Sequence, residues 1–441
     1  MKKLTTFSCA LITILPVLGH ALTLEQALTS ALDHSPEIHQ QCARYQAVLE
    51  TREEVTSNYY PQVSLHAAIG PEQTDYRGGQ EVDEQLTRDE VGLRVSQLLF
   101  NGFETSANSQ RLSHEAEAER WQLLASAENL ALQVCETYIN TRKAQTLLEL
   151  SERHVQDHEA ILTDVKGLTQ NGYANDTDLA QVSARLANAR ASLIAAQNNL
   201  YDSHAQFMRV VGLSPQNLVT PIADASLLPD NLSTALDWAR ENHPQIQSAL
   251  EDIEAAQEGV RASKSGYMPR LSIEGYASNN HDIGGLEGPE EDYRVMLVME
   301  YDLYNGGRDK ARAKAANWRY NESMEVRRNA EQQLIEGTRF AWNAVRSLQA
   351  QTSLLQNSVD ASTLAESGYI TQFKLGKRSL LDLLNAKVEV FSARKTYINT
   401  SQDLVLAQYR LLNATGRLGY SLRMIYPQQW QGEAQEQEDQ Q

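Results

Sequence analysis

Two histidines offer the most obvious chance of chemistry in this sequence. His154 and His158 lie four residues apart in a run with helical periodicity, so their side chains would share one face of the helix. Zinc ligands often show this spacing, but a catalytic zinc site also needs a third protein ligand and a positioned base. The sequence contains no HExxH motif. We therefore expect no catalytic residues, no metal site and no cofactor.

The composition favours long amphipathic helices over large globular cores. Only 7% of the 441 residues are aromatic and 41% are hydrophobic, while Ala, Leu, Gln, Asn, Glu and Arg are abundant. The formal net charge is -18, and no basic stripe offsets it. Such a chain repels nucleic acid, so we expect no nucleic-acid partner.

The N-terminus has the features of a secretory signal peptide. Residues 1–21 start with two lysines after Met1, continue with an apolar run and end in small residues at Ala21. A membrane anchor is the alternative, but the apolar run is short for a span. Cleavage after Ala21 would remove the two lysines and change the net charge from -18 to -20.

The mature chain would keep two cysteines, which do not make a disulfide framework. Cys42 would lie roughly 28 Å down one helix from the nearest predicted strand, and Cys135 roughly 50 Å down another. A disulfide needs Cα atoms within about 7 Å of each other. We expect both thiols to be free.

The sequence also contains an internal repeat. YYPQVSL (59–65) corresponds to YMPRLSI (267–273) at a separation of 208 residues, and LLFNG (98–102) corresponds to DLYNG (302–306) at a separation of 204. The two halves are colinear. Accordingly, we divide the mature chain into a first repeat (22–212), a linker (213–230), a second repeat (231–420) and a largely disordered tail (421–441).

Each repeat follows the same order of expected elements. Two shorter helices, the second ended by Pro61 or Pro269, precede two strands with alternating apolar and polar residues. The expected strands are about 62–70, 89–100, 270–279 and 292–304. Long helical hairpins follow at about 104–211 and 308–417, and the first helix of each is roughly 100 Å long. The returning helices carry heptad seams, which predict coiled-coil packing, with an ordinary helical bundle as the alternative.

Four strands are too few to close a barrel, and an open sheet would leave unpaired edges in lipid. The chain must therefore associate with other copies. Aromatic residues collect at the expected strand bases and suit a membrane interface, although packing on the helices would explain any one of them equally well. They are Tyr59, Tyr60, Phe100, Tyr267 and Tyr304.

These features resemble the TolC family of outer-membrane channel proteins. The resemblance covers nearly the whole mature chain and rests on the duplicated helix-strand-strand-helix-helix order, on PQVSL, LLFNG and LYNGG, and on the segments NGYANDTDL and LGKRSLLDLLNA. It implies a mainly α fold with a β-barrel portion: a homotrimer with a twelve-stranded barrel in the outer-membrane lipid and a twelve-helix tunnel in the periplasm.

The resemblance also implies a function and partners. Such a channel is the exit duct for a periplasmic adaptor (membrane fusion) protein and an inner-membrane ABC or proton-driven transporter. The run QVSARLANARASLIAAQNNL followed by FMRVVGLSP resembles members that serve type I protein secretion, which is the expected role. Multidrug or metal efflux is the alternative. A periplasmic coiled-coil adaptor is a further alternative, but it would lack the four strands.

Residues at the helix tips are implied to form a periplasmic gate. Arg378 occupies the family's latch position, and Asp178 with Thr177 matches its partner position on the other hairpin. Phe373 replaces a family tyrosine, and Asp382 with Asn385 replaces a pair of aspartates, so a weaker latch is expected. Exposed ions at helix ends without such a role are the plain alternative. Two tip glycines match the adaptor-docking positions, and helix C-capping would also explain them: Gly172 and Gly376.

Overall fold

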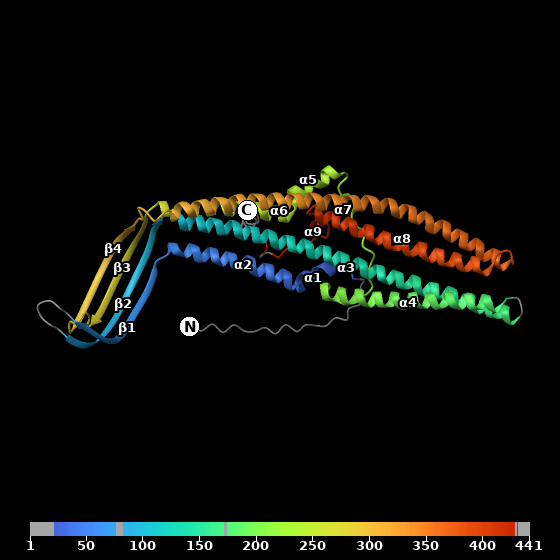
Figure 1. The fold of residues 1–441 in the computed structure, drawn as a ribbon, viewed down its shortest axis with the longest axis horizontal. Coiled ribbons are helices and arrows are strands. Elements are labelled where there is room, and N and C mark those ends of the chain that lie inside the picture. The colour runs from blue at the N-terminus through green and yellow to red at the C-terminus, as the bar shows by residue number, and fades with distance from the viewer. Residues whose placement is uncertain (1–21, 76–82, 172–173, 428–429, 431–441) are drawn as a thin grey trace, which may run out of the picture. The chain divides into compact units, whose positions relative to one another are not determined.

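The computed structural model describes residues 22–75, 83–171, 174–427 and 430 (Figure 1). The expected signal peptide and most of the expected disordered tail, residues 431–441, lie outside the described residues. The described chain forms two units. The first contains the residues up to Ser35, Glu128–Ala235 and Thr338–Ile425, and the second contains Pro36–Ala127, Leu236–Gly337 and the residues from Tyr426 onward.

The shorter helices begin where local chemistry satisfies their first N–H groups. In α1 (Leu24–His34), Thr23 and Gln26 form a capping box. Helices α2 (Pro36–Thr56) and α6 (Pro244–Ala262) both start with proline, whose missing N–H has no partner to lose at that position. A single 3-10 turn follows each of these two helices, and α5 (Leu232–Asn242) precedes α6.

Four long helices follow the sheet strands in two hairpins. The first hairpin consists of α3 (Glu104–Gln170) and α4 (Asp176–Val211), and the second of α7 (Arg308–Lys374) and α8 (Leu380–Ala414). A short α9 (Leu418–Ser421) ends the helical part. Both α3 and α7 contribute residues to each unit. In the described residues, no helix is long and apolar enough to be a membrane span.

In the first unit, seam residues of both returning helices are buried, among them Val182 and Leu186 of α4 and Leu383 and Val390 of α8. One apolar cluster joins Val165 of α3 and Val182 of α4 to Leu380 and Leu384 of α8. The linker between the repeats is fastened in the same unit by Tyr138, whose hydroxyl accepts the Val219 N–H at 3.0 Å. The coiled-coil packing expected from the seams is thus formed between helices of both repeats.

The second unit contains one antiparallel sheet, with strands in the order β1 (Gln62–Asp75), β2 (Asp83–Asn101), β3 (Arg270–His281), β4 (Pro289–Glu300). Pairs β1–β2 and β3–β4 are hairpins within each repeat, whereas β2–β3 joins the repeats. The two halves of the sequence therefore build one continuous sheet (Figure 1).

The strand ends differ from those that the alternation indicated. The β1–β2 ladder continues from Ile69↔Asp89 out to Asp75↔Asp83, through mainly polar residues that give no alternating signal. At the other end, β4 stops at Glu300 because its partner Arg270 is the first residue of β3. Tyr304, which we expected inside the last strand, therefore lies beyond it.

A β-bulge changes the direction of one aromatic side chain. Leu98 pairs with Ser272 and Phe100 pairs with Leu271, so Leu99 is an extra residue in β2. An extra residue shifts the alternation by one and moves the following side chain to the other face. Phe100 consequently shares a face with Leu271 and not with Ser272.

Candidate functional site

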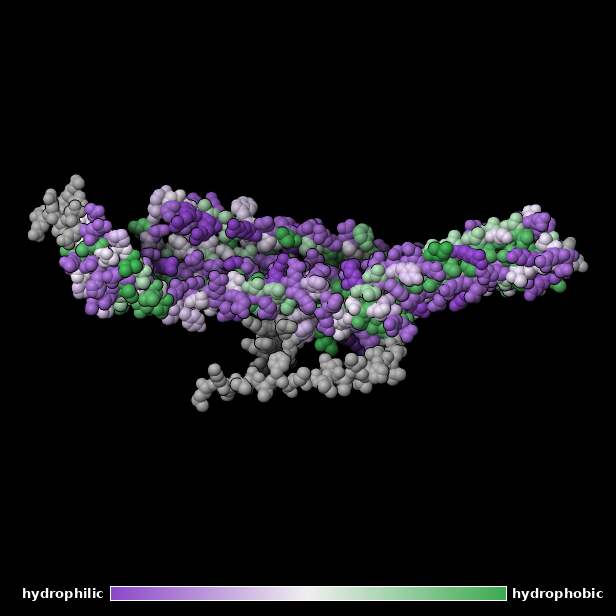
Figure 2. Space-filling view, turned by 90° about the horizontal axis from the view of Figure 1, so that it is seen from below, coloured by the Kyte–Doolittle hydropathy of each residue, from purple (hydrophilic) through white to green (hydrophobic). Residues whose placement is uncertain are grey.

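The sheet has two chemically different faces. Residues on one face are apolar and remain exposed in the chain, with exposed fractions that run from 43% for Leu93 to 80% for Val295. Figure 2 shows hydrophobic residues over the sheet, while much of the helical surface visible there is hydrophilic. This apolar face consists of Val63, Leu65, Ile69, Val91, Leu93, Tyr293, Val295, Leu297 and Met299.

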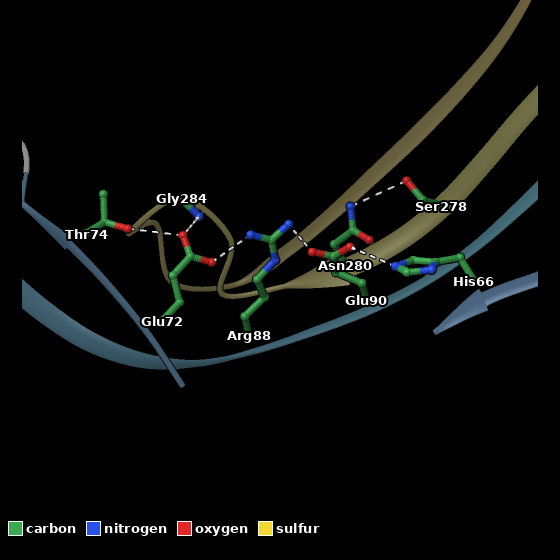
Figure 3. Close-up of polar contacts among 8 residues, drawn as sticks. All are labelled: His66, Glu72, Thr74, Arg88, Glu90, Ser278, Asn280 and Gly284. Atoms are coloured by element: carbon green, nitrogen blue, oxygen red, sulfur yellow. Dashed lines mark hydrogen bonds and ion pairs between the residues drawn. The ribbon is translucent and has the colours of Figure 1, made fainter. Parts of the chain in front are cut away.

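The opposite face carries the alternate, mostly polar residues. Near the loop end of the sheet, Glu72 accepts a hydrogen bond from Arg88 at 3.0 Å, and Arg88 also pairs with Glu90 (Figure 3). Further along, the ring of Tyr276 lies between Arg94 and Arg294, with 4.6 Å from the Arg294 guanidinium to the ring centroid. We call this the polar face.

The five aromatic residues expected at the membrane interface take different environments. Tyr59, Tyr60 and Tyr267 are 48%, 67% and 51% exposed, and Tyr304 is 87% exposed. Phe100 is half-buried and packs edge-on against Phe103, with ring centroids 5.2 Å apart. All five lie near the junction of strands and helices in sequence, and their membrane role stays a prediction.

The turn between α7 and α8 contains a glycine in the left-handed region. Gly376 has φ +69°, its N–H donates to Phe373 O, and the Lys377 N–H donates to Gln372 O. These two bonds form a Schellman motif, so capping accounts for this glycine whatever else binds there. Gly172, the other expected docking glycine, lies outside the described residues.

Arg378 follows that turn and is held by its own hairpin. It donates to Gln372 Oε1 at 3.0 Å, lies 3.7 Å from the Asp382 carboxylate and covers the ring of Tyr369 at 4.8 Å. Among the described residues it makes no hydrogen bond or ion pair to Asp178, so the structure of one chain does not bring these two expected latch residues together.

The expected partner residues on α4 serve the start of that helix. Asp178 and Asn175 form a capping box: the Asp178 N–H donates to Asn175 Oδ1 at 2.8 Å, and the Asn175 N–H donates back at 3.4 Å. A carboxylate here is also favoured by the helix dipole. Thr177 is exposed beside it.

The remaining two gate candidates face other partners. Phe373 packs, half-buried, against the apolar cluster that contains Val182 and Leu384. Asn385 accepts a hydrogen bond from Arg185 of α4 at 3.1 Å, which links the two hairpins near their tips. Sequence reasoning missed Arg185, because nothing in a local pattern relates residues 200 positions apart.

A second missed contact joins three helices. The Lys387 ammonium on α8 lies 3.0 Å from Asp157 of α3 and 2.6 Å from Glu366 of α7. The side chains of Lys387 and Glu366 are only 14% and 12% exposed. No spacing rule singles these residues out, since each is an ordinary charged residue on a long helix.

His154 and His158 pack between helices in the way that apolar side chains do. His158 is fully buried, and within the described structure neither of its ring nitrogens has a hydrogen-bond partner. His154 stacks on Phe391 of α8 and meets His158 edge-on, with ring centroids 4.5 Å apart. Burial lowers the pKa of His154 to about 4. The described residues contain no group of three or more metal-ligating side chains.

Comparison with characterised proteins gives relatives along nearly the whole chain. The outer membrane efflux protein BepC of Brucella suis is 26% identical over 397 residues, which cover 90% of this chain and 86% of BepC. The outer membrane protein TolC of Vibrio cholerae is 22% identical over 433 residues, which cover 95% of this chain and 96% of TolC.

The fold is shared with solved channel structures. The CmeC outer membrane channel of Campylobacter jejuni matches with a TM-score of 0.79 at 16% identity, over 90% of this chain and 86% of that chain. The sequence profile described as outer membrane efflux protein matches residues 27–213 and 235–417, most of both repeats. The chain therefore belongs to the outer membrane efflux protein family, whose TolC-like members are not enzymes but outer-membrane channels of tripartite export systems.

Proposed function

We propose that this chain is the exit duct of a type I protein secretion system, and that three copies complete the conduit. Channels of the family are trimers that work with a periplasmic adaptor and an inner-membrane transporter. For this chain, we propose the class of cargo, the kinds of transporter and adaptor, and the gate residues.

The observation that carries the proposal is the incomplete sheet. Its apolar face is exposed, and β1 and β4 each pair along one side only in the described chain. Unpaired backbone groups in hydrocarbon cost several kcal/mol each. Neighbouring copies remove both edges if β1 of one chain pairs with β4 of the next. Three copies give a closed barrel of twelve strands, with the apolar face toward lipid and the polar face toward the pore.

An uncovered stripe on α4 supports the same assembly. Ile194, Tyr201 and Met208 are spaced by seven residues and are 66%, 72% and 56% exposed. A heptad-spaced apolar stripe is typical of a helix that packs against a partner. We infer that a neighbouring copy covers it in the trimer.

For the gate, we propose that Arg378 reaches Asp178 and Thr177 of a neighbouring copy when the tips are closed. In one chain the guanidinium is half-exposed beside Asp382, and Asp178 remains partly exposed while it caps α4. Charge-assisted bonds of this kind are strong enough to hold a constriction and still yield to a docked partner. Adaptor docking is proposed at the tips, at Gly172 and Gly376.

The cargo proposal rests on sequence resemblance within the α4 region. It agrees with a 22% identical relative, the alkaline protease secretion protein AprF of Pseudomonas aeruginosa. An equally similar relative is the cation efflux system protein CusC of Escherichia coli, which favours metal or drug efflux as the second candidate. A pore lined by charged and polar side chains suits either cargo.

The test has two parts. The chain purified in detergent should be a trimer that forms pores in planar lipid bilayers, and a single-copy species without pores would overturn the duct. Affinity capture from cross-linked cells should then recover an ABC transporter with its adaptor, and a deletion strain should lose one secreted protein. Recovery of a proton-driven transporter, with unchanged secreted proteins, would move the assignment to efflux.

A further inference from the structure

The loop between β3 and β4 folds back over the sheet. We call residues 282–288 the strap. The Gly284 N–H donates to Glu72 of β1 at 3.1 Å, although β2 lies between β1 and β3 in the sheet (Figure 3). A β-carbon added at Gly285 would lie 3.1 Å from the Cβ of Thr74. Since Glu72 and Thr74 belong to the polar face, the strap crosses that face from β3 to β1.

The backbone of the strap is well defined. Asp282, Gly284, Gly285 and Gly288 all have positive φ, from 55° to 117°, which curls the segment tightly. Its two ends are joined, because the Asp282 N–H donates to Gly288 O at 3.0 Å and the Gly288 N–H donates to Asp282 Oδ1 at 2.8 Å. These two bonds between its ends restrict the conformations that the strap can adopt.

Glu72, which holds the strap, is itself anchored. Its carboxylate accepts from Arg88 at 3.0 Å and from the Thr74 hydroxyl at 3.1 Å, in addition to the Gly284 N–H. Arg88 also forms an ion pair with Glu90, whose side chain is 16% exposed, and His66 Nε2 lies 3.9 Å from Glu90 Oε2. A row of charged contacts across β1 and β2 therefore fixes the place where the strap lands.

We propose that the strap narrows the outer mouth of the assembled channel, and that Glu72 is the residue that holds it across the pore. The inference rests on the proposed function, in which the polar face lines the conduit. The strap lies at the end of the sheet away from the helices, and symmetry would place one strap per copy at the same height. The straps would then limit the size of what leaves the channel.

The first test removes the strap without disturbing the sheet. Deletion of residues 283–287 leaves Asp282 and Gly288 as a two-residue loop between His281 and Pro289, the last pair of the ladder. Asp-Gly is a favoured two-residue hairpin turn, so this variant should fold. Its single-channel conductance should rise above that of the wild type.

A point variant tests the role of Glu72. Glu72→Ala should raise the conductance in the same direction as the deletion, because it releases the Gly284 N–H. The matched control is Glu290→Ala, which removes the same charge from the same face opposite Asn280. In the described structure the Glu290 side chain forms no hydrogen bond or ion pair with the strap. If the deletion and Glu72→Ala both conduct like the wild type, or if the control rises equally, the inference is wrong.

A cross-link tests the position of the strap without any pore. Thr74→Cys with Gly285→Cys, in a Cys42→Ser background, places two β-carbons slightly closer than in a relaxed disulfide, with backbone strain at Gly285 because its φ is +77°. The remaining cysteine of the mature chain, Cys135, is buried, and burial raises its thiol pKa, so it is unreactive. The disulfide should form, and because Glu72 already holds the strap, conductance should stay near the wild-type value both with the disulfide and after its reduction. Failure to form it overturns the strap, whereas a disulfide in protein that makes no pores overturns the proposed function alone.

Discussion

The imidazole ring of His154 lies nearly flat on the ring of Phe391, with 4.1 Å between their centroids and 17° between their planes. This contact joins α3 to α8 and leaves His154 only 9% exposed. His154 also meets the fully buried His158 edge-on. Two uncharged imidazoles thus serve as packing material in a seam between the two repeats.

We predict that this seam loosens in acid. Burial, then the neighbouring His158, lowers the pKa of His154 from 6.5 to about 4, and the pKa of His158 is also lowered by burial. Lys387 and Arg185 act in the same direction, whereas Asp157 opposes them. Because the folded pKa is depressed, stability is fully present above pH 6.5 and falls as the pH drops toward 4, by about 3 kcal/mol for His154.

The measurement is amide hydrogen exchange around residues 150–160 between pH 7 and pH 5, corrected for intrinsic exchange rates. Protection should fall in the wild type but stay constant when His154→Phe and His158→Leu are combined. His39→Gln, which changes an exposed histidine of α2, is the control and should behave like the wild type. Equal loss of protection in the double variant would refute the role of the pair.

Glu128 should show the opposite pH dependence. Its carboxylate is 6% exposed and accepts the Gly419 N–H at 2.8 Å. Burial raises the pKa of Glu128 to about 7, against the lowering effect of the N–H groups of Gly419 and Leu418. The folded state therefore holds a proton that the unfolded state has lost, and stability declines as the pH rises from 4.5 to 7. Glu128→Gln should abolish this slope and stabilise residues 418–424 at pH 8 by up to about 3 kcal/mol; lower protection of that segment at pH 8 would contradict the prediction.

The Lys387 contact should be a major tie between helices. Lys387→Ala leaves the nearly buried Glu366 carboxylate without its cation, which should cost about 3 kcal/mol, the lower end for broken buried pairs because Asp157 is half-exposed. Arg190→Ala is the control: it breaks an exposed pair with Glu159 and should cost less than about 1 kcal/mol. Thermal unfolding in detergent compares the two, and equal shifts would argue against a special role for Lys387.

Equivalent glycines in the two repeats should tolerate alanine differently. Gly102 and Gly306 have φ of 66° and 69°, but a β-carbon at Gly102 would lie 2.6 Å from the Ser265 carbonyl oxygen, whereas one at Gly306 meets nothing within 4 Å. Gly306→Ala should cost about 1 kcal/mol for its backbone conformation alone. Gly102→Ala adds a backbone clash and should cost about 3 kcal/mol. Matching unfolding temperatures for the two variants would show that the close approach at Gly102 relaxes freely.

The gate residues are tested by conductance. Arg378→Ser removes every contact of the guanidinium at the α7–α8 tip and should raise the conductance of reconstituted channels. Lys377→Ser removes the neighbouring exposed charge and should leave conductance near the wild-type value. If the Arg378→Ser channel conducts like the wild type, Arg378 only stabilises its own hairpin and is not a latch.

The sequence alone determined the order and type of the elements. Each signal that we used depends only on residues close together in the sequence. These signals are the proline at the first position of α2 and α6, the period of two in the strands, and the seven-residue seams of α4 and α8. The repeat added that both halves form the same elements. The mainly helical fold with four strands followed from these patterns, and the resemblance to the TolC family rested on the duplicated order of elements and on motifs such as PQVSL and LYNGG. The comparisons confirmed both.

The tertiary structure decided which elements meet. A heptad seam shows which side of a helix is apolar but not which helix covers it, so Arg185 with Asn385 and Lys387 with Glu366 had no signal in the sequence. The same holds for the bulge at Leu99 and for Glu72 under the strap. Such contacts depend on the register of strands and helices far apart in the chain. Register is set by how these segments pack against each other in the folded chain, because no single segment contains both partners.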